Sequence, residues 1–391
     1  MISVIQALNI IENESTLLSN DNINVRESIG YCLNQKIIST IDMPPFDQSA
    51  MDGYALNYDI SISNYNIIGE VKAGDDCSKI ILQKGDCIRI FTGAAVPKGA
   101  TTIIQQEWCN NENNVLSFNK KIKDSLNIRK KGEQIRQGDT ILNKNHIINP
   151  ASMGLISTVG INNINIIRKA KVAIVITGDE LIKSTDEIKD AKIFESNSSM
   201  LYGALNKYGY DDINIYFTKD SKKQTELTIS KAINDNDLII VSGGISVGDY
   251  DFVKFAFDQL NVKEKFYKIN QKPGKPIFFG TKKNKYIFGL PGNPGASLTC
   301  FYIYVLRCLS LISNKKYPLL KTKVKLSSHY RKKGNRAEFI KAKVKNNQAE
   351  ICSHQSSAML LSFAKANALV FIDENISEVS SKDYLDAYLL L

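Results

Sequence analysis

The feature that most constrains the fold is a regular alternation of strand-like and helix-like segments between Lys171 and about Ile312. Short runs rich in Val and Ile alternate with longer segments whose apolar residues recur at helical spacing. This alternation favours a mostly parallel, doubly wound α/β sheet. The predicted strands lie at 171–177, 213–218, 237–242 and 285–290, and the predicted helices at 199–209, 225–235, 249–260 and from about 295 to 312.

The regions on either side of this alternation have a different pattern of apolar and turn-forming residues. Apolar residues at helical spacing predict helices over 4–11 and 25–33. Pro44-Pro45 breaks any helix, and short Ile- and Val-rich runs separated by Gly, Asn and Asp then predict β-strands over 60–148. A short helix is predicted at 150–159. The chain therefore combines helical, β and α/β regions.

These changes in residue pattern along the chain predict a multidomain α/β protein in four parts. Near the end, the segment FIKAKVK at 339–345 alternates apolar residues with lysines, which predicts a half-buried strand with one solvated lysine face. The predicted parts are a helical and linker domain (1–42 plus 140–169), an inserted β lid domain (43–139), an α/β domain (170–315) and a small C-terminal β domain (316–391).

Composition and charge exclude several classes of protein. The net charge of +10 indicates anionic partners such as phosphorylated small molecules, but no RNA- or DNA-binding motif occurs, so we expect no nucleic acid. The most apolar stretch, 298–312, contains Arg307 and is shorter than the roughly 20 residues of a membrane span. The N-terminus lacks the basic region of a signal peptide. We therefore expect a cytoplasmic protein without membrane contact.

The cysteines and histidines give no sign of a metal cluster. The seven cysteines are irregularly spaced without a C-x-x-C pair, and the chain has three histidines. This pattern argues against a zinc site or a disulfide framework. The chain also lacks G-x-x-x-x-G-K-[ST], G-x-G-x-x-G and H-E-x-x-H, so it is not a standard nucleotide-hydrolysing, dinucleotide-binding or zinc-protease sequence.

Doubly wound sheets bind ligands beyond the carboxyl ends of their strands, and three such ends carry unusual loops. The first loop, Thr177-Gly178-Asp179-Glu180-Leu181, places two acids after a strand. Such carboxylates are suitable ligands for Mg²⁺ bridging to phosphate oxygens. Capping of a following helix by Asp179 is an equally good interpretation.

The second loop follows the strand at 237–242 and enters a helix. Its glycines let backbone amides approach a bound anion, and the helix N-terminus adds favourable partial charge. The loop also contains G-x-S-x-G, the nucleophile elbow of serine hydrolases, with His329 or His354 available downstream but without an H-G-G-G motif. The loop consists of Ser242, Gly243, Gly244, Ile245, Ser246, Val247, Gly248, Asp249, Tyr250 and Asp251.

The third loop is Pro291-Gly292-Asn293-Pro294-Gly295, whose prolines fix the backbone and whose Asn293 can contact a ligand or cap the next helix. Upstream of it, lysines gather around a rigid Pro-Gly turn, which favours an anion-binding site. That segment contains Lys268, Lys272, Pro273, Gly274, Lys275 and Pro276.

Eight segments in order resemble the molybdopterin molybdenumtransferase family, the bacterial MoeA type and the C-terminal enzymatic part of gephyrin. They include PPFDQSAMDGYA, RIFTGAAVPKGATTIIQQE, KVAIVITGDEL, FESNSSML, VSGGISVGDYDFVK, QKPGKPIFFG, FGLPGNPGAS and, in the tail, RAEFIKA, and they extend over nearly the whole chain. The resemblance implies a homodimer whose four parts per chain include a β-barrel tail and a molybdopterin-binding α/β domain. It also implies that molybdate is transferred to adenylylated molybdopterin with release of AMP, in the presence of Mg²⁺, in a cleft completed by the lid of the opposing subunit.

The resemblance assigns roles by matched position. Catalytic roles fall on Asp52, Thr92, Glu180, Asp220, Asp251, Lys268 and Lys272. Substrate binding falls on Gly243, Gly244, Ser246, Gly248, Asp249, Lys275, Pro291, Gly292, Asn293 and Pro294. The Mg²⁺ ligands are expected at Glu180 and Asp251. Contacts with the pterin adenylylating enzyme and with apo-molybdoenzymes are further expectations.

The chain departs from the family pattern at three places. Gly132-Glu133-Gln134 stands where the family has Gly-Glu-Asp, so the loss of a charge at Gln134 puts that position's catalytic part in question. Ser356-Ser357-Ala358 replaces a Gly-Ser-Gly-like stretch, so the turn there can differ. Gly295 replaces a common valine, a change that we expect to be harmless.

Three alternative functions compete with molybdate insertion. A pterin adenylylating enzyme shares the α/β domain, but the lid and tail segments argue against it. A pterin-binding scaffold without catalysis is the second alternative, and the largely intact set of acids and lysines argues against it. A serine hydrolase using the Gly244–Gly248 elbow is the third and weakest. Whether molybdate or tungstate is the natural oxyanion does not follow from the sequence.

Overall fold

The computed structural model describes residues 1–182, 184–188, 190–245 and 252–390. Four residues expected in the site, Ser246, Gly248, Asp249 and Asp251, lie outside the described residues. The chain forms two compact units. Unit 1 contains Met1–Asp21, Gly30–Cys32 and Ile166–Leu391, and unit 2 contains Asn22–Ile29 and Leu33–Asn165. The four-part division with its boundaries stays a prediction.

Unit 1 is built on a six-stranded sheet in the order β17-β14-β18-β22-β21-β19. The first four strands pair in parallel, and β21 pairs antiparallel with both β22 and β19. All residues of β14 are buried, as expected for a strand covered on both faces. The strands are β14 (Val172–Thr177), β17 (Ile213–Thr218), β18 (Leu238–Ser242), β19 (Lys263–Tyr267), β21 (Phe278–Lys282) and β22 (Lys285–Leu290). The strands predicted from the sequence are confirmed.

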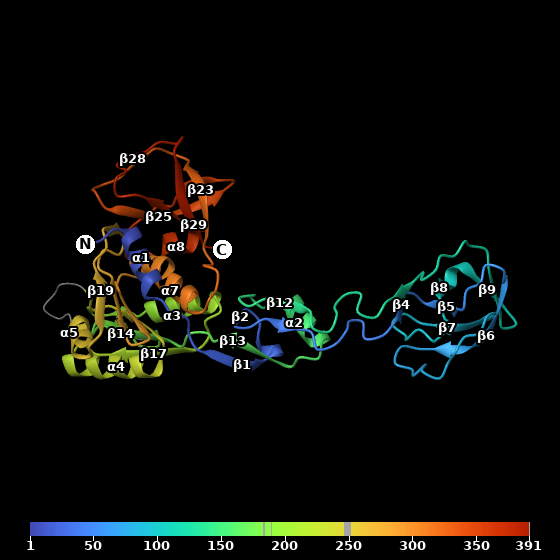
Figure 1. Ribbon diagram of the computed structural model, residues 1–391. Helices are drawn as coiled ribbons and strands as arrows, with labels where there is room; N and C mark the ends of the chain where they lie inside the picture. Colours follow the sequence, from blue (N-terminus) through green and yellow to red (C-terminus); the bar gives the residue numbers. More distant parts are fainter. Residues whose placement is uncertain (183, 189, 246–251, 391) are drawn as a thin grey trace. The chain divides into compact units, whose positions relative to one another are not determined.

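Helices cover both faces of this sheet because β14 and β18 are apolar on both sides. Val172, Ile174 and Ile176 pack with α1, α3 and the 294–312 helix, whereas Ala173 and Val175 pack with α4 and α5 (Figure 1). The helices are α1 (Val4–Glu14), α3 (Asn197–Lys207), α4 (Lys222–Asp235), α5 (Phe252–Gln259), α6 (Pro294–Cys300) and α7 (Leu306–Ile312).

The segment Pro294–Ile312 is one continuous helix with a π-helical turn, η3 (Phe301–Val305), between α6 and α7. It has 19 residues and is apolar enough to cross a membrane, so it is longer than the stretch identified in the sequence. However, 89% of its most apolar window is buried inside the fold. A helix that is apolar all round and buried in this way is typical of the core of a globular domain.

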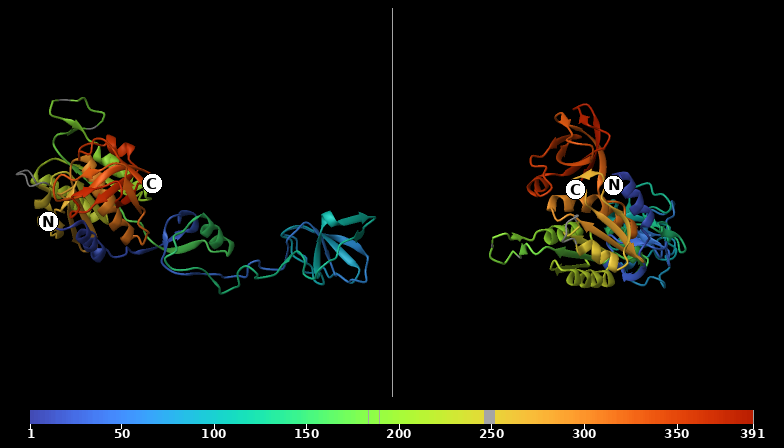
Figure 2. Two further views of the ribbon diagram at one scale, coloured as in Figure 1. Left: turned by 90° about the horizontal axis from the view of Figure 1, so that it is seen from above. Right: turned by 90° about the vertical axis from the view of Figure 1, so that its left-hand side faces the viewer.

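The C-terminal region of unit 1 is a closed five-stranded barrel, which confirms the expected barrel (Figure 2). Its order is β25-β26-β23-β29-β27, closed by pairing of β27 with β25. The strands are β23 (Leu320–Leu326), β25 (Ala337–Lys345), β26 (Gln348–Ile351), β27 (Ala368–Ile372) and β29 (Tyr384–Leu389). β20 (Gln271–Lys272) pairs in parallel with β25, which brings the lysine-rich turn against the barrel. Smaller elements are β24 (Tyr330–Arg331), β28 (Glu378–Val379) and α8 (Leu361–Lys365).

The predicted solvated lysine face of β25 is wrong at one position. Lys343 and Lys345 are exposed, but Lys341 is 2% exposed. The reason is the segment between β26 and α8, whose backbone carbonyls accept hydrogen bonds from Lys341 Nζ. The alternation of residue types could not show that this segment folds over the strand.

Unit 2 contains a six-stranded sheet in the order β8-β5-β7-β6-β10-β9. Its strands are β5 (Gly53–Leu56), β6 (Asn64–Val71), β7 (Asp86–Ile90), β8 (Thr102–Gln105), β9 (Cys109–Glu112) and β10 (Val115–Phe118). Two small pairs join β3 (Ile37–Ile38) with β12 (Thr140–Leu142) and β4 (Gln48–Ser49) with β11 (Ile128–Arg129). The remaining elements of the described chain are β1 (Asn20–Asn24), β2 (Cys32–Leu33), β13 (Asn163–Ile167), α2 (Pro150–Thr158) and the 3₁₀ turns η1 (Val25–Glu27) and η2 (Gln106–Trp108), together with β15 (Leu181–Ile182) and β16 (Ile193–Phe194), which belong to unit 1.

The helix predicted over 25–33 is wrong. Asn24 caps a single 3₁₀ turn by accepting from the Arg26 amide. The Ser28 hydroxyl then bonds the carbonyl of Val25, and Gly30 has a φ of +75°. Local polar side chains therefore compete with helical hydrogen bonding and end the turn after three residues.

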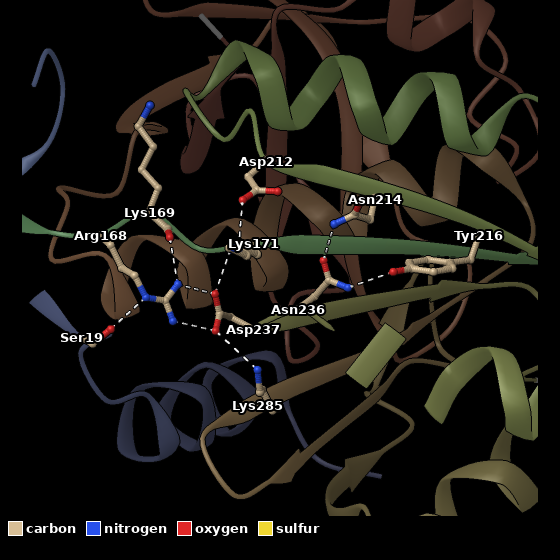
Figure 3. A network of polar contacts seen from close by, with 10 residues as sticks. All are labelled: Ser19, Arg168, Lys169, Lys171, Asp212, Asn214, Tyr216, Asn236, Asp237 and Lys285. Atoms are coloured by element: carbon tan, nitrogen blue, oxygen red, sulfur yellow. Dashed lines mark hydrogen bonds and ion pairs between the residues drawn. The ribbon is translucent and has the colours of Figure 1, made fainter. Parts of the chain in front are cut away.

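A partly buried ion pair anchors the amino-terminal end of the unit 1 sheet (Figure 3). Arg168 binds both carboxylate oxygens of Asp237, at 2.5 and 2.8 Å. The amide of Lys171, just before β14, donates to the same carboxylate at 2.9 Å, and Lys285 lies 3.7 Å away. Burial opposes ionisation of Asp237, but these donors outweigh it and hold its pKa below the usual range. The network joins the starts of β14, β18 and β22, at the end of the sheet opposite the loops that carry the candidate site.

Candidate functional site

The carboxyl ends of β14, β17, β18 and β22 surround a cavity of about 600 Å³, which we call the acidic cavity. Its position agrees with the rule that open α/β sheets bind ligands beyond the carboxyl ends of their strands. The described residues that line it include Thr177, Gly178, Glu180, Glu195, Asn197, Asp220, Ser242, Gly243, Gly244, Pro276, Pro291, Gly292, Asn293 and Pro294. Most of the sequence-predicted binding residues within the described chain are thus brought together.

The acids of this cavity are fixed by the ends of two neighbouring strands. Asp220, after β17, accepts hydrogen bonds from the Thr177 hydroxyl and from the Asp179 amide at 3.2 Å. Asp179 in turn accepts from the Asp220 amide at 3.2 Å. Asp179 does not cap a helix, because the strand β15 follows it, so that interpretation is wrong. Asp179 instead holds Asp220 beside Glu180 at the cavity wall.

The glycines of the loop after β18 allow close approach of backbone segments. Gly243 has a φ of +98°, and a Cβ there would lie 2.6 Å from the Thr177 carbonyl oxygen. Gly244 has a φ of +59°, and its Cβ would lie 2.8 Å from Val253. Both conformations favour glycine, so the loop backbone stays open toward the cavity.

We expect Gly243→Ala to weaken binding of adenylylated molybdopterin, the ligand that the sequence resemblance implies, at least about tenfold, because a left-handed alanine with a blocked Cβ costs about 1–3 kcal/mol and must move the loop. Fluorescence titration with this pterin measures the change in affinity. The matched control is Gly203→Ala in α3, where a Cβ meets nothing within 4 Å. Equal affinities of the two variants would show that the loop backbone does not contact the ligand.

The proline loop after β22 is tied to the other strand ends by Asn197, the first residue of α3. Its Nδ2 donates to the Ser242 hydroxyl at 2.9 Å and to the Gly292 carbonyl at 2.8 Å. Its buried Oδ1 has no hydrogen-bond partner among the described residues. Asn197 therefore fixes the spacing between two loops of the cavity and leaves one acceptor for a ligand or a water molecule.

A second cavity of about 450 Å³, the basic cavity, adjoins the first and shares Pro276, Pro291 and Asn293 with it. Among the described residues, three cationic ones line it: Lys272, Lys275 and Arg336. Guanidinium and ammonium groups around one cavity are suited to a tetrahedral oxyanion. The other lining residues are Pro273, Gly274, Ala296, Gln355, Ser356 and Ser357.

The turn that carries Lys272 and Lys275, residues 272–275, is held by contacts with buried residues behind it. Buried Gln271 donates to the Pro273 carbonyl at 2.9 Å, and a Cβ at Gly274 would lie 2.4 Å from Cys300 Sγ. Glu338 of β25 is 3% exposed and accepts from Lys272 Nζ at 3.2 Å. These contacts fix the turn and orient Lys272 along the cavity wall.

Comparisons with known proteins identify this arrangement. Residues 2–160 match the family "MoeA N-terminal region (domain I and II)", 173–311 match "Probable molybdopterin binding domain" and 323–390 match "MoeA C-terminal region (domain IV)". The molybdopterin molybdenumtransferase of Staphylococcus epidermidis is 30% identical over 385 residues, covering 95% of this chain and 91% of that protein. The chain belongs to the molybdopterin molybdenumtransferase family.

Two further members of this family are also similar to the chain over most of its length. The molybdopterin molybdenumtransferase of Haemophilus influenzae is 31% identical over 375 residues, covering 92% of this chain and 91% of that protein. The crystal structure of the molybdopterin biosynthesis MoeA protein of Pyrococcus horikoshii has a TM-score of 0.84 at 28% identity and covers 100% of this chain and 99% of that one. The family resemblance and the multidomain α/β fold expected from the sequence are confirmed.

Asp52 and Thr92, the two residues that the sequence resemblance assigned to the lid, lie together in unit 2. The Thr92 amide and hydroxyl both donate to Asp52 Oδ1 at 2.8 Å. These hydrogen bonds lower the pKa of Asp52. Arg89 lies over the ring of Phe91, 4.8 Å from its centroid. Gln134 lines a separate unit 2 cavity of about 750 Å³ with Arg129 and Glu133.

Not every predicted site residue reaches a cavity, and some lining residues were missed. Lys268 is not among the described residues that line either cavity, and its Nζ lies 4.9 Å from the ring centroid of Tyr267. Asn197 and Arg336 lie in sequence segments that matched the family, ESN and RAEF, but received no role. Their isolated polar side chains carry no pattern that signals a site without the fold.

Proposed function

We propose that this chain transfers molybdate to adenylylated molybdopterin and releases AMP, as a transferase of molybdenum cofactor biosynthesis. The observation that carries the proposal is the pair of adjoining cavities with opposite charge. One has glycine loops and acids at the strand ends, and the other has three cations, with Pro276, Pro291 and Asn293 common to both. Two substrates bound side by side would meet at this shared wall.

The acidic cavity suits the nucleotide and pterin part of the substrate. Glycine-loop amides and the N-terminus of α3 favour phosphate oxygens. The oxygen donors Glu180 and Asp220 match the preference of Mg²⁺ for carboxylates combined with substrate phosphates, so we propose that they hold this ion together with Asp251. When bound, Mg²⁺ would neutralise charge on the phosphate. Asp220 is positioned for this by the Thr177 hydroxyl.

The basic cavity suits the molybdate dianion. Lys275 and Arg336 provide charged donors, and Ser356 and Ser357 add neutral residues whose hydroxyls can hydrogen-bond an oxyanion. Lys272 is half exposed, with its side chain 46% accessible, and stays directed by Glu338. We propose that these residues hold the oxyanion, compensate its charge and stabilise negative charge that develops as AMP departs.

We further propose that the protein works as a cytoplasmic homodimer that meets the pterin adenylylating enzyme and apo-molybdoenzymes. These statements rest on the family alone. The serine-hydrolase alternative has little support. His329 pairs with Glu378, and His354 bonds the Ser353 hydroxyl on the barrel. We expect no labelling of Ser246 by a fluorophosphonate.

Reconstitution tests the proposed reaction. Purified protein with adenylylated molybdopterin and Mg²⁺ is expected to release AMP only when molybdate is added and to activate an apo-molybdoenzyme. A parallel reaction with ATP and molybdopterin tests the adenylylating alternative. Accumulation of adenylylated pterin in that reaction, without molybdate-dependent AMP release in the first, would refute the insertion assignment. Tight pterin binding with no release would indicate a scaffold.

We expect Asp52→Ala to lower the rate of molybdate-dependent AMP release at least about tenfold while leaving thermal stability unchanged, because its carboxylate is exposed and held ionised by Thr92. Asp76→Ala is the matched control, since Asp76 is an exposed acid of unit 2 that caps a local turn at Ser78. Equal rates for the two variants would remove Asp52 from the catalytic set.

A further inference from the structure

The segment between β26 and α8, residues 352–360, folds over a buried ammonium group. Lys341 Nζ donates to the backbone carbonyls of His354 at 3.3 Å, Ser356 at 3.1 Å and Met359 at 3.4 Å. These three acceptors come from one turn of chain, which we call the serine loop, residues 354–359. A lysine that is 2% exposed and bonded to carbonyls instead of a carboxylate is unusual, because burial of an unpaired charge is costly.

The base of the serine loop is fixed by the same strand position. The Lys341 amide donates to Gln355 Oε1 at 3.0 Å, and Gln355 Nε2 donates back to the Lys341 carbonyl at 2.8 Å. The Ser362 hydroxyl also bonds the His354 carbonyl at 2.9 Å. Burial lowers the pKa of Lys341. The side chain and backbone of Lys341 therefore both act on one short loop.

The outer side of the serine loop packs on the start of α6. The Ala296 amide donates to the Ser357 carbonyl at 3.0 Å, and Asn293 Nδ2 donates to the Ser357 hydroxyl at 3.1 Å. A Cβ on Gly295 would lie 2.8 Å from the Ser357 carbonyl oxygen. The glycine at this position lets the loop backbone approach α6, because a side chain there would occupy the same space.

This loop forms part of both cavities. Gln355, Ser356 and Ser357 line the basic cavity, and Ala358 lines the acidic cavity. Lys341 itself lines neither cavity, since its ammonium group lies behind the loop. A displacement of the loop would change the shape of the oxyanion cavity without removing any of its three cations.

We propose that Lys341 is a positioning residue for oxyanion binding: its buried ammonium group holds the serine loop against α6 and thereby sets the part of the basic cavity wall that this loop forms. This inference rests on the proposed function for the identity of the oxyanion, molybdate. It predicts that changes at Lys341 weaken the binding of molybdate more than that of the pterin, because the acidic cavity is formed mainly by the strand-end loops that Lys341 does not touch.

The test compares Lys341→Met, Lys341→Arg and Gly295→Ala in the full chain. Methionine keeps the length of the side chain but cannot donate to carbonyls, whereas arginine can. Gly295→Ala displaces the same loop from its other side. Lys343→Met is the matched control, because Lys343 lies two residues along the same strand and is exposed. Calorimetric binding of molybdate, fluorescence binding of adenylylated molybdopterin and the kinetics of AMP release are measured for each.

We expect Lys341→Met and Gly295→Ala to raise the Kd and KM for molybdate about tenfold or more, with the pterin Kd changed less than about twofold. Lys341→Arg should recover most of the affinity, and Lys343→Met should match the wild type. A folded Lys341→Met protein with unchanged molybdate affinity overturns the inference, as does an equal loss for both ligands. If Lys341→Met does not fold, unchanged molybdate affinity in Gly295→Ala overturns it.

Failure of the proposed function gives a different pattern. If the wild type binds molybdate but releases no AMP, the reaction is wrong, while the comparison of molybdate affinities still decides the role of Lys341. If the wild type binds no molybdate at all, both ideas fail together at the oxyanion cavity.

Discussion

The double substitution Lys275→Met/Arg336→Met is expected to raise the KM for molybdate at least about 100-fold in the AMP-release reaction. Both side chains line the basic cavity. A hydrogen bond from a charged donor contributes about 1.5–3 kcal/mol, so losing two corresponds to a factor of about 10² to 10⁴ in affinity. The Kd for adenylylated molybdopterin should change little, because the acidic cavity is intact.

The double variant Lys343→Met/Lys345→Met controls for the loss of two positive charges. Both lysines are exposed on β25, so their removal changes the net charge equally but leaves the basic cavity unaltered. Initial rates at a series of molybdate concentrations measure the effect. Equal KM values for the two double variants would mean that the oxyanion does not bind between Lys275 and Arg336.

The second large effect is expected on stability. Arg168→Met should lower the free energy of unfolding by about 3 kcal/mol, because the Asp237 side chain is 7% exposed and would lose a bidentate partner. The Lys171 amide and Lys285 remain near the carboxylate, which limits the loss. Urea unfolding followed by circular dichroism measures it. Lys171→Met, in the exposed pair with Asp212, is the control and should cost less than about 1 kcal/mol.

The contribution of this ion pair should depend on pH in a defined direction. The folded-state pKa of Asp237 is lowered, so its stabilisation is present above the unfolded-state value of about 3.9 and is lost as pH falls through the folded-state pKa. The stability difference between the wild type and Arg168→Met should therefore be constant from neutral pH to about pH 5 and shrink in more acidic solution. A difference that grows on acidification would contradict this role of Asp237.

The core of the fold could be predicted because its physical signal is local. Each strand of the parallel sheet is an unbroken apolar run between polar loops, and this pattern follows directly from burial on both faces. The prediction of a helix over 25–33 failed because the side chains of Asn24 and Ser28 form hydrogen bonds with backbone groups that a helix would use. Apolar spacing alone does not report such competition.

The site was predictable where it depends on loops that leave strands. Glu180, Asp220, Gly243 and Asn293 meet in one cavity because parallel strands bring their carboxyl ends to one edge. Arg336 belongs to the barrel, and it joins the site through the pairing of β20 with β25. That long-range pairing leaves no periodic signal near Arg336, so the third cation of the basic cavity could not be found from the sequence.

Buried Lys341 shows the same limit in a sharper form. In the sequence it is one of three lysines that alternate with apolar residues, and the other two are exposed. Its different environment comes from the serine loop, residues 354–359, whose backbone carbonyls accept hydrogen bonds from Lys341 Nζ. The residue type does not show that a loop will cover this lysine, but the three backbone carbonyls around its ammonium group in the folded protein do.

The most direct test of the account is the location of the oxyanion itself. Crystals soaked in tungstate, an isosteric dianion, would be measured at a wavelength where tungsten scatters anomalously. The account predicts a strong anomalous peak in the basic cavity, within roughly 3–4 Å of Lys275 Nζ and the Arg336 guanidinium, as expected for charge-assisted hydrogen bonds to oxygens around the metal. A well-occupied peak elsewhere, with this cavity empty and AMP release still dependent on the oxyanion, would contradict it.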